Sequence, residues 1–349
     1  KPSVAAKLLK RRLRETGNGT FAGPDAEKVT FEQLAAGLVN DYTVNGRRSL
    51  KRAELSIKHL RESFGLRRAV DITRSRMDAH VAARLAGGAK PATVQAEVAA
   101  LRRMFSLAVR AGLLPTRPAF DNLKFENTRT RSFTDAELQA VLHVLEHGRP
   151  ATVNEPELPP QPDLAAVVAF AATTGWRVPS EVLPLQWAQV DLAAGTVSLA
   201  RGTTKSGQPR VFPFSALPQL AAVIHDQRER TSVLERERGV IIPHVFHRAG
   251  RQIRDMYDPW RAACAAAGVP GRFLHDLRRT AARGLRALGL SDRDICELCG
   301  WETQVMVGRY LGRDPAGVAD RLRAKVSESE KRTRTFRARF QDSAQVEQR

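Results

Sequence analysis

Four consecutive segments within residues 30–112 repeat apolar side chains at the spacing of one helical face. The first opens with Thr30 and Gln33, the residue pair of a capping box, and the fourth opens with Pro91 and ends at Gly112. Each segment carries one apolar stripe, and helices of this length bury such stripes against one another. The pattern therefore restricts this part of the chain to a small helical bundle.

The faces opposite these apolar stripes are basic. Over the whole chain 56 Lys and Arg stand against 37 Asp and Glu, a formal net charge of +19 at pH 7. A globular protein this basic commonly binds a polyanion, most often nucleic acid, and a merely solvated charged surface is the alternative. We expect the bundle to contact a DNA phosphate backbone through Lys51, Arg52, Lys58, Arg61, Arg102 and Arg103.

The rest of the chain predicts a second unit that mixes helices with a small antiparallel sheet. Thr134 and Glu137 repeat the capping-box signature, and residues 163–174 are almost wholly apolar, as in a buried helix. Further elements follow from alternation and turn residues: strands over 196–199 and 211–214, a hairpin turn over 203–207, and helices from there to about residue 326.

Proline-rich and charged stretches divide the chain. Residues 114–131 contain Pro115 and Pro118 without a clear period, which is typical of an interdomain linker. The predicted organisation is a basic N-terminal arm over residues 1–27, a helical DNA-binding domain over 28–113, a linker over 114–131, a larger domain over 132–326 and a C-terminal tail over 327–349.

Four separated segments of the larger domain carry cationic or ring-bearing side chains suited to a phosphate. An arginine follows the buried helix and a glycine turn, which places it at the edge of the core. A lysine stands at the hairpin tip, where it can swing towards a ligand. A histidine and a second arginine are spaced i and i+3, on one helical face. In chain order the set is Arg177, Lys205, His275 with Arg278, and Trp301 with Tyr310.

This ordered set, with Gly300 before Trp301, resembles the tyrosine recombinase (phage integrase) family over roughly residues 28–326. The resemblance implies a mainly α fold with a small antiparallel β-sheet, built from a helical, SAM-like core-binding domain and an α+β catalytic domain. It also implies a site-specific DNA recombinase or integrase that cleaves and rejoins strands, without a metal, through a 3′-phosphotyrosyl intermediate.

The chemistry of strand cleavage explains the two arginines and the tyrosine. Displacing a phosphodiester builds negative charge on the nonbridging oxygens, and the guanidinium groups of Arg177 and Arg278 can clamp those oxygens while staying charged. Such fixed cations are the main source of catalysis in phosphoryl transfer without a metal. Tyr310 would supply the nucleophilic oxygen.

Three further roles come from the resemblance. It implies that Lys205 protonates the departing 5′-oxygen, with Arg201 and Arg210 as nearby substitutes. His275 would be a proton-transfer partner near the nucleophile or the phosphate. Trp301 would donate its indole N–H to a phosphate oxygen or simply pack against the nucleophile's helix.

The match to the family pattern has departures. The acidic residue Glu181 lies four positions after Arg177 rather than three, which puts the local helix start in doubt. Trp301 stands where the family commonly has a second histidine.

Two of the assigned roles have a competing residue. Arg279 is adjacent to Arg278 and competes for its role, and Tyr257 is the next candidate for the nucleophile.

We expect no cofactor and no metal site. Cys296 and Cys299 have a zinc-like spacing but lack a second pair, so we interpret them as core residues of one helix. No apolar run approaches the roughly 20 residues that span a membrane. The resemblance implies double-stranded DNA as the partner, self-association into a tetramer on DNA, a DNA-bending or directionality factor as a helper, and a cytoplasmic, nucleoid-associated location.

Two other functions remain open. A type IB topoisomerase-like relaxase would use the same arginines, histidine and tyrosine on a monomer. A catalytically inactive DNA-binding regulator is the alternative of another class. The sequence argues against the regulator, because a chemically competent residue occupies every family catalytic position.

Overall fold

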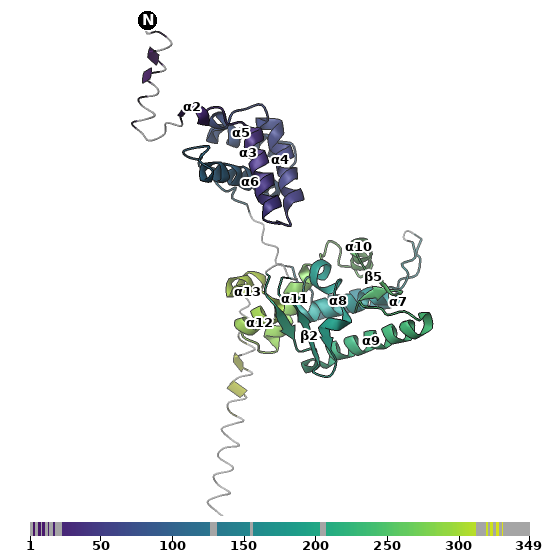
Figure 1. Cartoon of the computed structure of the whole chain (residues 1–349). Coiled ribbons are helices and arrows are strands. Elements are labelled where there is room, and N and C mark those ends of the chain that lie inside the picture. The colour runs from purple at the N-terminus through teal and green to yellow at the C-terminus, as the bar shows by residue number, and fades with distance from the viewer. Residues whose placement is uncertain are drawn as a thin grey trace, which may run out of the picture. The chain divides into compact units, whose positions relative to one another are not determined.

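The computed structural model describes residues 23–125, 131–153, 156–202 and 207–311 without a break, together with isolated positions nearer the two ends. The chain folds into two compact units, Lys1–Thr128 and Arg129–Arg349, drawn in Figure 1 from purple to blue and from teal to yellow. The boundary between the units falls inside the segment 114–131.

The first unit is a helical bundle. Its four main helices occupy the four segments in which the apolar periodicity predicts them. The described helices of this unit from residue 23 onward are α2 (Gly23–Ala26), α3 (Phe31–Val44), α4 (Leu50–Phe64), the 3-10 turn η1 (Ala69–Asp71), α5 (Arg74–Ala86) and α6 (Pro91–Arg110).

Side-chain caps fix where these helices begin. The Thr30 N–H donates to Gln33 Oε1 at 2.8 Å, and the Gln33 N–H donates to Thr30 Oγ1 at 3.3 Å, so the predicted capping box forms. Thr73 Oγ1 accepts a hydrogen bond from the Arg76 N–H at the start of α5. Ser49 precedes α4 without a side-chain capping bond.

The first half of the segment 114–131 packs on this bundle and differs from a free linker. Leu114 and Phe120 are buried in the core of the first unit. The Phe120 ring meets Phe105 edge-on at 5.8 Å, and Arg102 donates to the Phe120 carbonyl oxygen at 2.5 Å. Leu114 and Phe120, which flank the two prolines, thus belong to the core of the first unit, because burying an aromatic or aliphatic side chain removes apolar surface from water.

The second unit holds the remaining helices. It begins with α7, whose capping box joins Thr134 and Glu137 as the sequence predicts. The described helices and turns are α7 (Asp135–His147), α8 (Pro162–Thr174), η2 (Val178–Val182), η3 (Trp187–Gln189), η4 (Phe214–Ala216), α9 (Pro218–Arg238), α10 (Tyr257–Ala266), α11 (Asp276–Ala287), α12 (Asp292–Cys299) and α13 (Gln304–Leu311).

Two small antiparallel sheets accompany these helices. The first has the order β1 (Val190–Asp191), β2 (Thr196–Leu199) and β3 (Arg210–Phe212), with Val197 of β2 between Val190 and Phe212. The second joins β4 (His247–Arg248) to β5 (Arg251–Gln252). The hairpin of β2 and β3 agrees with the sequence prediction, although its turn at 203–206 lies outside the described residues. The prediction of continuous helix after this hairpin was wrong at β4 and β5, because two-residue strands are too short to show alternation.

Helix α8 lies at the centre of the second unit. It packs against α11, α7, α9 and η2, and Leu164, Val167 and Phe170 are fully buried. Figure 1 shows α8 between α11 and α7. Its neighbours explain why the sequence is apolar on every side of this helix. Because α8 is fixed on all sides, the residues that follow it, Gly175 to Arg177, are fixed at the edge of the core. No helix in the described ranges is both long enough and apolar enough to cross a membrane.

Candidate active site

A buried carboxylate, Glu181, organises the segment that follows α8. Glu181 Oε2 accepts the Arg177 backbone N–H at 2.7 Å, and Oε1 accepts Arg177 Nη1 at 2.7 Å. The turn η2 is π-helical: the N–H groups of Val182 and Leu183 bond to carbonyls five residues earlier. Such a turn accommodates one extra residue and is common at functional sites. This explains how an acidic residue four positions after the arginine still faces it.

Three arginines, one from the same turn and two from distant parts of the chain, converge on Glu181. Arg177 Nη1 and Arg210 Nη2 both contact Oε1, at 2.7 and 2.6 Å, and Arg278 Nη1 lies 3.9 Å from Oε2. Burial by itself would raise the pKa of Glu181, but the hydrogen bonds from Arg177 and the charge of Arg210 outweigh it and lower that pKa. Three guanidinium cations against one carboxylate leave a positive excess, which suits an anion.

Arg278 is held by backbone oxygens. Its Nη1 donates to the Gly175 carbonyl oxygen, and its Nη2 donates to the Cys299 carbonyl oxygen at 3.3 Å. Its side chain is only 2% exposed, and its guanidinium lies 5.5 Å from the ring centroid of Trp301. Gly175 has a φ of +66°, and a Cβ there would lie 2.8 Å from Cys299 Sγ. The three segments therefore meet too closely for a side chain at position 175.

His275 stands at the start of the helix that carries Arg278. It is the N-terminal flanking residue of α11, and it is exposed at the surface. Partial desolvation lowers the pKa of His275, and the charges of Arg278, Arg279 and Arg177 lower it further. Arg177, far away in sequence, is thus close enough to influence the ring. At neutral pH the imidazole is held in the neutral form, which can accept a proton.

The last segment of the predicted set is only partly described. Trp301 is 6% exposed and packs in a small apolar cluster with Val307 of α13, and α13 packs against α11 and α12. Tyr310 belongs to α13, but its side chain lies outside the described part of the structure. Lys205 also lies outside it. The structure thus brings Arg177, His275, Arg278 and Trp301 together, and the places of the other two side chains remain predictions.

Arg210 is the buried member of the cluster that sequence reasoning did not recognise. It entered the sequence analysis only as a substitute for Lys205. One signal was available: the strand alternation in β3 puts Arg210 on the same face as Phe212, and both are buried. A charged residue on an inward face requires a partner, and here Glu181 provides it.

The six residues expected to bind DNA in the first unit fall into two groups. Lys51, Arg52 and Lys58 are exposed on α4. The other three are engaged within the unit: Arg61 pairs with Glu32 at 2.7 Å, Arg103 pairs with Asp41 at 3.0 Å, and Arg102 donates to Phe120 and Asn122.

The cysteines behave as core residues. Burial raises the pKa of the Cys299 thiol to about 12, and Cys296 is partly buried beside it. In the described ranges no three His, Cys, Asp or Glu side chains gather as they would around a metal ion.

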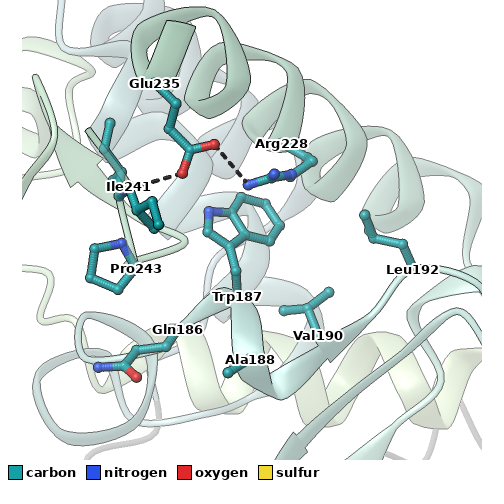
Figure 2. Close-up of a pocket in the computed structure, with 10 residues that line it drawn as sticks. Gln186, Trp187, Ala188, Val190, Leu192, Arg228, Glu235, Ile241 and Pro243 are labelled. Carbon is teal, nitrogen blue, oxygen red and sulfur yellow. Dashed lines mark hydrogen bonds and ion pairs between the residues drawn. The ribbon is translucent and has the colours of Figure 1, made fainter. Parts of the chain in front are cut away.

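A separate pocket of about 440 Å³ lies elsewhere in the second unit (Figure 2). Arg228 lies over the Trp187 ring at 5.2 Å and pairs with Glu235, which also accepts the Ile242 N–H. None of the residues to which we assign a catalytic role lines this pocket.

Comparison with known proteins identifies the family. Residues 131–316, more than half of the 349-residue chain, match the model of the phage integrase family. The chain belongs to the phage integrase family. This integrase-family chain is 29% identical over 170 residues to the integrase of Salmonella phage P22, covering 47% of this chain and 42% of the relative. It is 45% identical over 58 residues to the integrase of Saccharopolyspora erythraea, covering 17% of this chain and 13% of the relative.

These two matches cover only part of each relative. The aligned part of the integrase-family chain spans less than half the length of either curated relative. The fold is similar to lambda integrase solved as a tetramer bound to a Holliday junction, with a TM-score of 0.64, 19% identity, and coverage of 90% of this chain and 89% of that chain. The predicted mainly α, two-part recombinase fold is therefore confirmed.

Proposed function

We propose that this phage integrase family member is a site-specific recombinase that cleaves and rejoins DNA through a covalent bond to Tyr310. The observation that carries the proposal is the convergence of Arg177 and Arg278 on one buried carboxylate, with His275 within electrostatic reach of both. Family membership alone leaves open whether a given chain is active, and this cluster supports activity.

In the proposed reaction the two arginines bind the scissile phosphate. The Arg177 side chain is 26% exposed and can donate to a nonbridging oxygen while it keeps its bond to Glu181. Arg278, whose side chain is almost fully buried near Glu181, adds positive charge in surroundings of low dielectric constant. Charge that develops on the phosphate oxygens would meet fixed cations that need no reorganisation.

The covalent step exchanges one phosphate ester for another. The Tyr310 oxygen forms a bond to phosphorus as the bond from phosphorus to the 5′-oxygen breaks, and His275 accepts the phenol proton. Lys205 donates a proton to the departing oxygen, so charge and protons balance. Attack of a 5′-hydroxyl on the phosphotyrosyl bond reverses the same steps and joins a new strand.

We propose double-stranded DNA as the partner, with four copies of the chain assembling on two duplexes, as the lambda integrase tetramer does on a Holliday junction. The tail over residues 327–349 is our candidate for contact with a neighbouring copy, and removing it should weaken synapsis but not single-site binding. We also propose that a DNA-bending or directionality factor assists the reaction, and that the protein acts on DNA in the cytoplasm.

Covalent trapping tests the reaction class. The probe is a pool of duplexes with randomised sequence, each nicked so that the short cleaved fragment diffuses away and religation fails. The wild-type chain should form an adduct that survives denaturing electrophoresis. A Tyr310→Phe variant should bind the pool equally and form none. Adducts that persist in this variant would place the nucleophile elsewhere, with Tyr257 next to be tested.

A plasmid assay separates the recombinase from the relaxase. A type IB topoisomerase-like enzyme would relax any supercoiled plasmid as a monomer, whereas a recombinase requires its own site. The recombinase proposal would be overturned by two results together. The protein would relax an arbitrary plasmid rapidly, and the adducts trapped from the randomised pool would show no sequence preference.

A further inference from the structure

Arg210 is a charged residue almost completely enclosed by the candidate active site. Its side chain is 2% exposed, and it begins strand β3 directly after the hairpin turn that contains Lys205. Burial lowers the pKa of Arg210, and the charge of Glu181 acts in the opposite direction. Enclosing a guanidinium is costly unless its bonds are satisfied. The role of Arg210 can therefore be inferred from the groups that it contacts.

Those contacts tie three separate segments together. Arg210 Nη2 lies 2.6 Å from Glu181 Oε1, and Nη1 donates to the Cys299 carbonyl oxygen at 2.7 Å. The guanidinium also lies over the Trp176 ring at 5.3 Å, and the Trp176 indole N–H donates to the Leu298 carbonyl oxygen. The segment after α8, the end of α12 and the base of the hairpin thus share this one side chain.

Both oxygens that Arg210 contacts, one in an ion pair and one in a hydrogen bond, are shared with a candidate catalytic arginine. Glu181 Oε1 also accepts Arg177 Nη1, and the Cys299 carbonyl oxygen also accepts Arg278 Nη2. A displacement of Arg210 would therefore free both acceptors at once. Arg177 and Arg278 would keep their bonds to these two oxygens, but the oxygens would lose the contact with Arg210 that helps to fix their positions.

Gly300 shows how closely Arg210 fits. It ends α12 in the left-handed conformation, with a φ of +66°, and a Cβ at this position would lie 2.1 Å from Arg210 Nη1. Any side chain at position 300 would push the guanidinium away. Gly239, which ends α9 with a φ of +64°, has open space around the same position. The two glycines share a backbone conformation and differ in the neighbour.

We infer that Arg210 is a positioning residue for DNA cleavage, which aligns Arg177 and Arg278 through the oxygens they share with it and fixes the base of the hairpin to which Lys205 belongs in sequence. The inference rests on the proposed function, because it concerns the rate of the same covalent step. Arg210 itself touches no DNA in this scheme, since it is enclosed by protein.

The test compares Arg210→Lys, Gly300→Ala, the double variant and the control Gly239→Ala. Lysine keeps the charge but not the forked geometry. Adduct formation is measured in single turnovers at saturating nicked-duplex pool, with DNA affinity and the thermal midpoint from tryptophan fluorescence measured in parallel. We expect Arg210→Lys and Gly300→Ala each to slow the step about 100-fold, the scale of a 1 Å misplacement, with little change in affinity. The double variant should be no slower than either single variant, because both displace one group. Gly239→Ala should cleave like the wild type.

The outcomes separate this inference from the proposed function. If the wild type forms no adduct, the proposed function fails first. If the wild type cleaves and both variants match its saturated rate while only their thermal midpoints fall, Arg210 merely stabilises the fold and the inference is wrong. The inference would also be wrong if the rate of the double variant fell by the product of the two single-variant losses. Should Arg210→Lys fail to fold, Gly300→Ala against Gly239→Ala decides the question.

Discussion

Replacing Glu181 with glutamine should destabilise the second unit severely. The carboxylate is fully buried and has three guanidinium groups within 2.6–3.9 Å. Removing one partner of a buried ion pair costs about 3–5 kcal/mol, because the remaining charge is left without compensation. Glutamine keeps the shape and one acceptor oxygen, but its amide would face an arginine. We therefore expect a loss of about 3 kcal/mol in the free energy of unfolding.

Tryptophan fluorescence during urea unfolding reports this loss of stability for the second unit specifically. All four tryptophans, Trp176, Trp187, Trp260 and Trp301, belong to the second unit. The midpoint should fall with little change in the slope against urea, as expected for a change in stability alone.

A matched variant supplies the control. Glu235 also pairs with an arginine, Arg228, at 3.4 Å, but that arginine is 37% exposed. Glu235→Gln keeps an acceptor for the Ile242 N–H, so we expect a loss of about 0–1 kcal/mol. A loss below about 1 kcal/mol for Glu181→Gln as well would show that the three arginines do not depend on Glu181, and our account of the site would be refuted.

Three further predictions concern protons. The pKa of His275 lies below its ordinary value, so adduct formation should fall as the pH drops through that lowered pKa, and His275→Ala should remove this acid limb from the pH profile. Burial likewise lowers the pKa of His80, which contacts Glu97 at 3.0 Å. The folded first unit thus binds fewer protons than the unfolded one. Its stability should fall as the pH drops below about 6.5, and a flat thermal midpoint by circular dichroism of that unit would contradict this. Lys205→Ala should slow cleavage of ordinary DNA but not of DNA with a sulfur in place of the bridging 5′-oxygen, because a thiolate leaves without a proton; equal slowing of both substrates would exclude Lys205 as the acid.

Local chemistry was enough to predict most helices from the sequence. Capping pairs such as Thr134 with Glu137 fix a helix start through bonds between near neighbours, and these form as expected. The wholly apolar stretch of α8 could be placed in the core because no other environment accommodates it. The ordered set Arg177, His275 and Arg278 could be assembled only through the family resemblance, since no local rule joins residues so far apart.

The features that were missed depend on contacts across the fold. The π turn after Arg177 follows from Glu181 folding back towards the arginine, and periodicity in so short a segment does not reveal it. The role of Arg210 needed the position of Cys299, which belongs to another helix. Strands β4 and β5 are held by pairing with each other rather than by their own composition.

Two of the acceptors that hold the arginines are main-chain oxygens, those of residues 175 and 299. Substitution of the Cys299 side chain leaves this carbonyl group in place, so it tests the packing of a buried thiol and not the acceptor that holds the arginines. Chemical replacement of that one amide by an ester, which weakens the carbonyl as an acceptor, would expose a dependence invisible to ordinary mutagenesis.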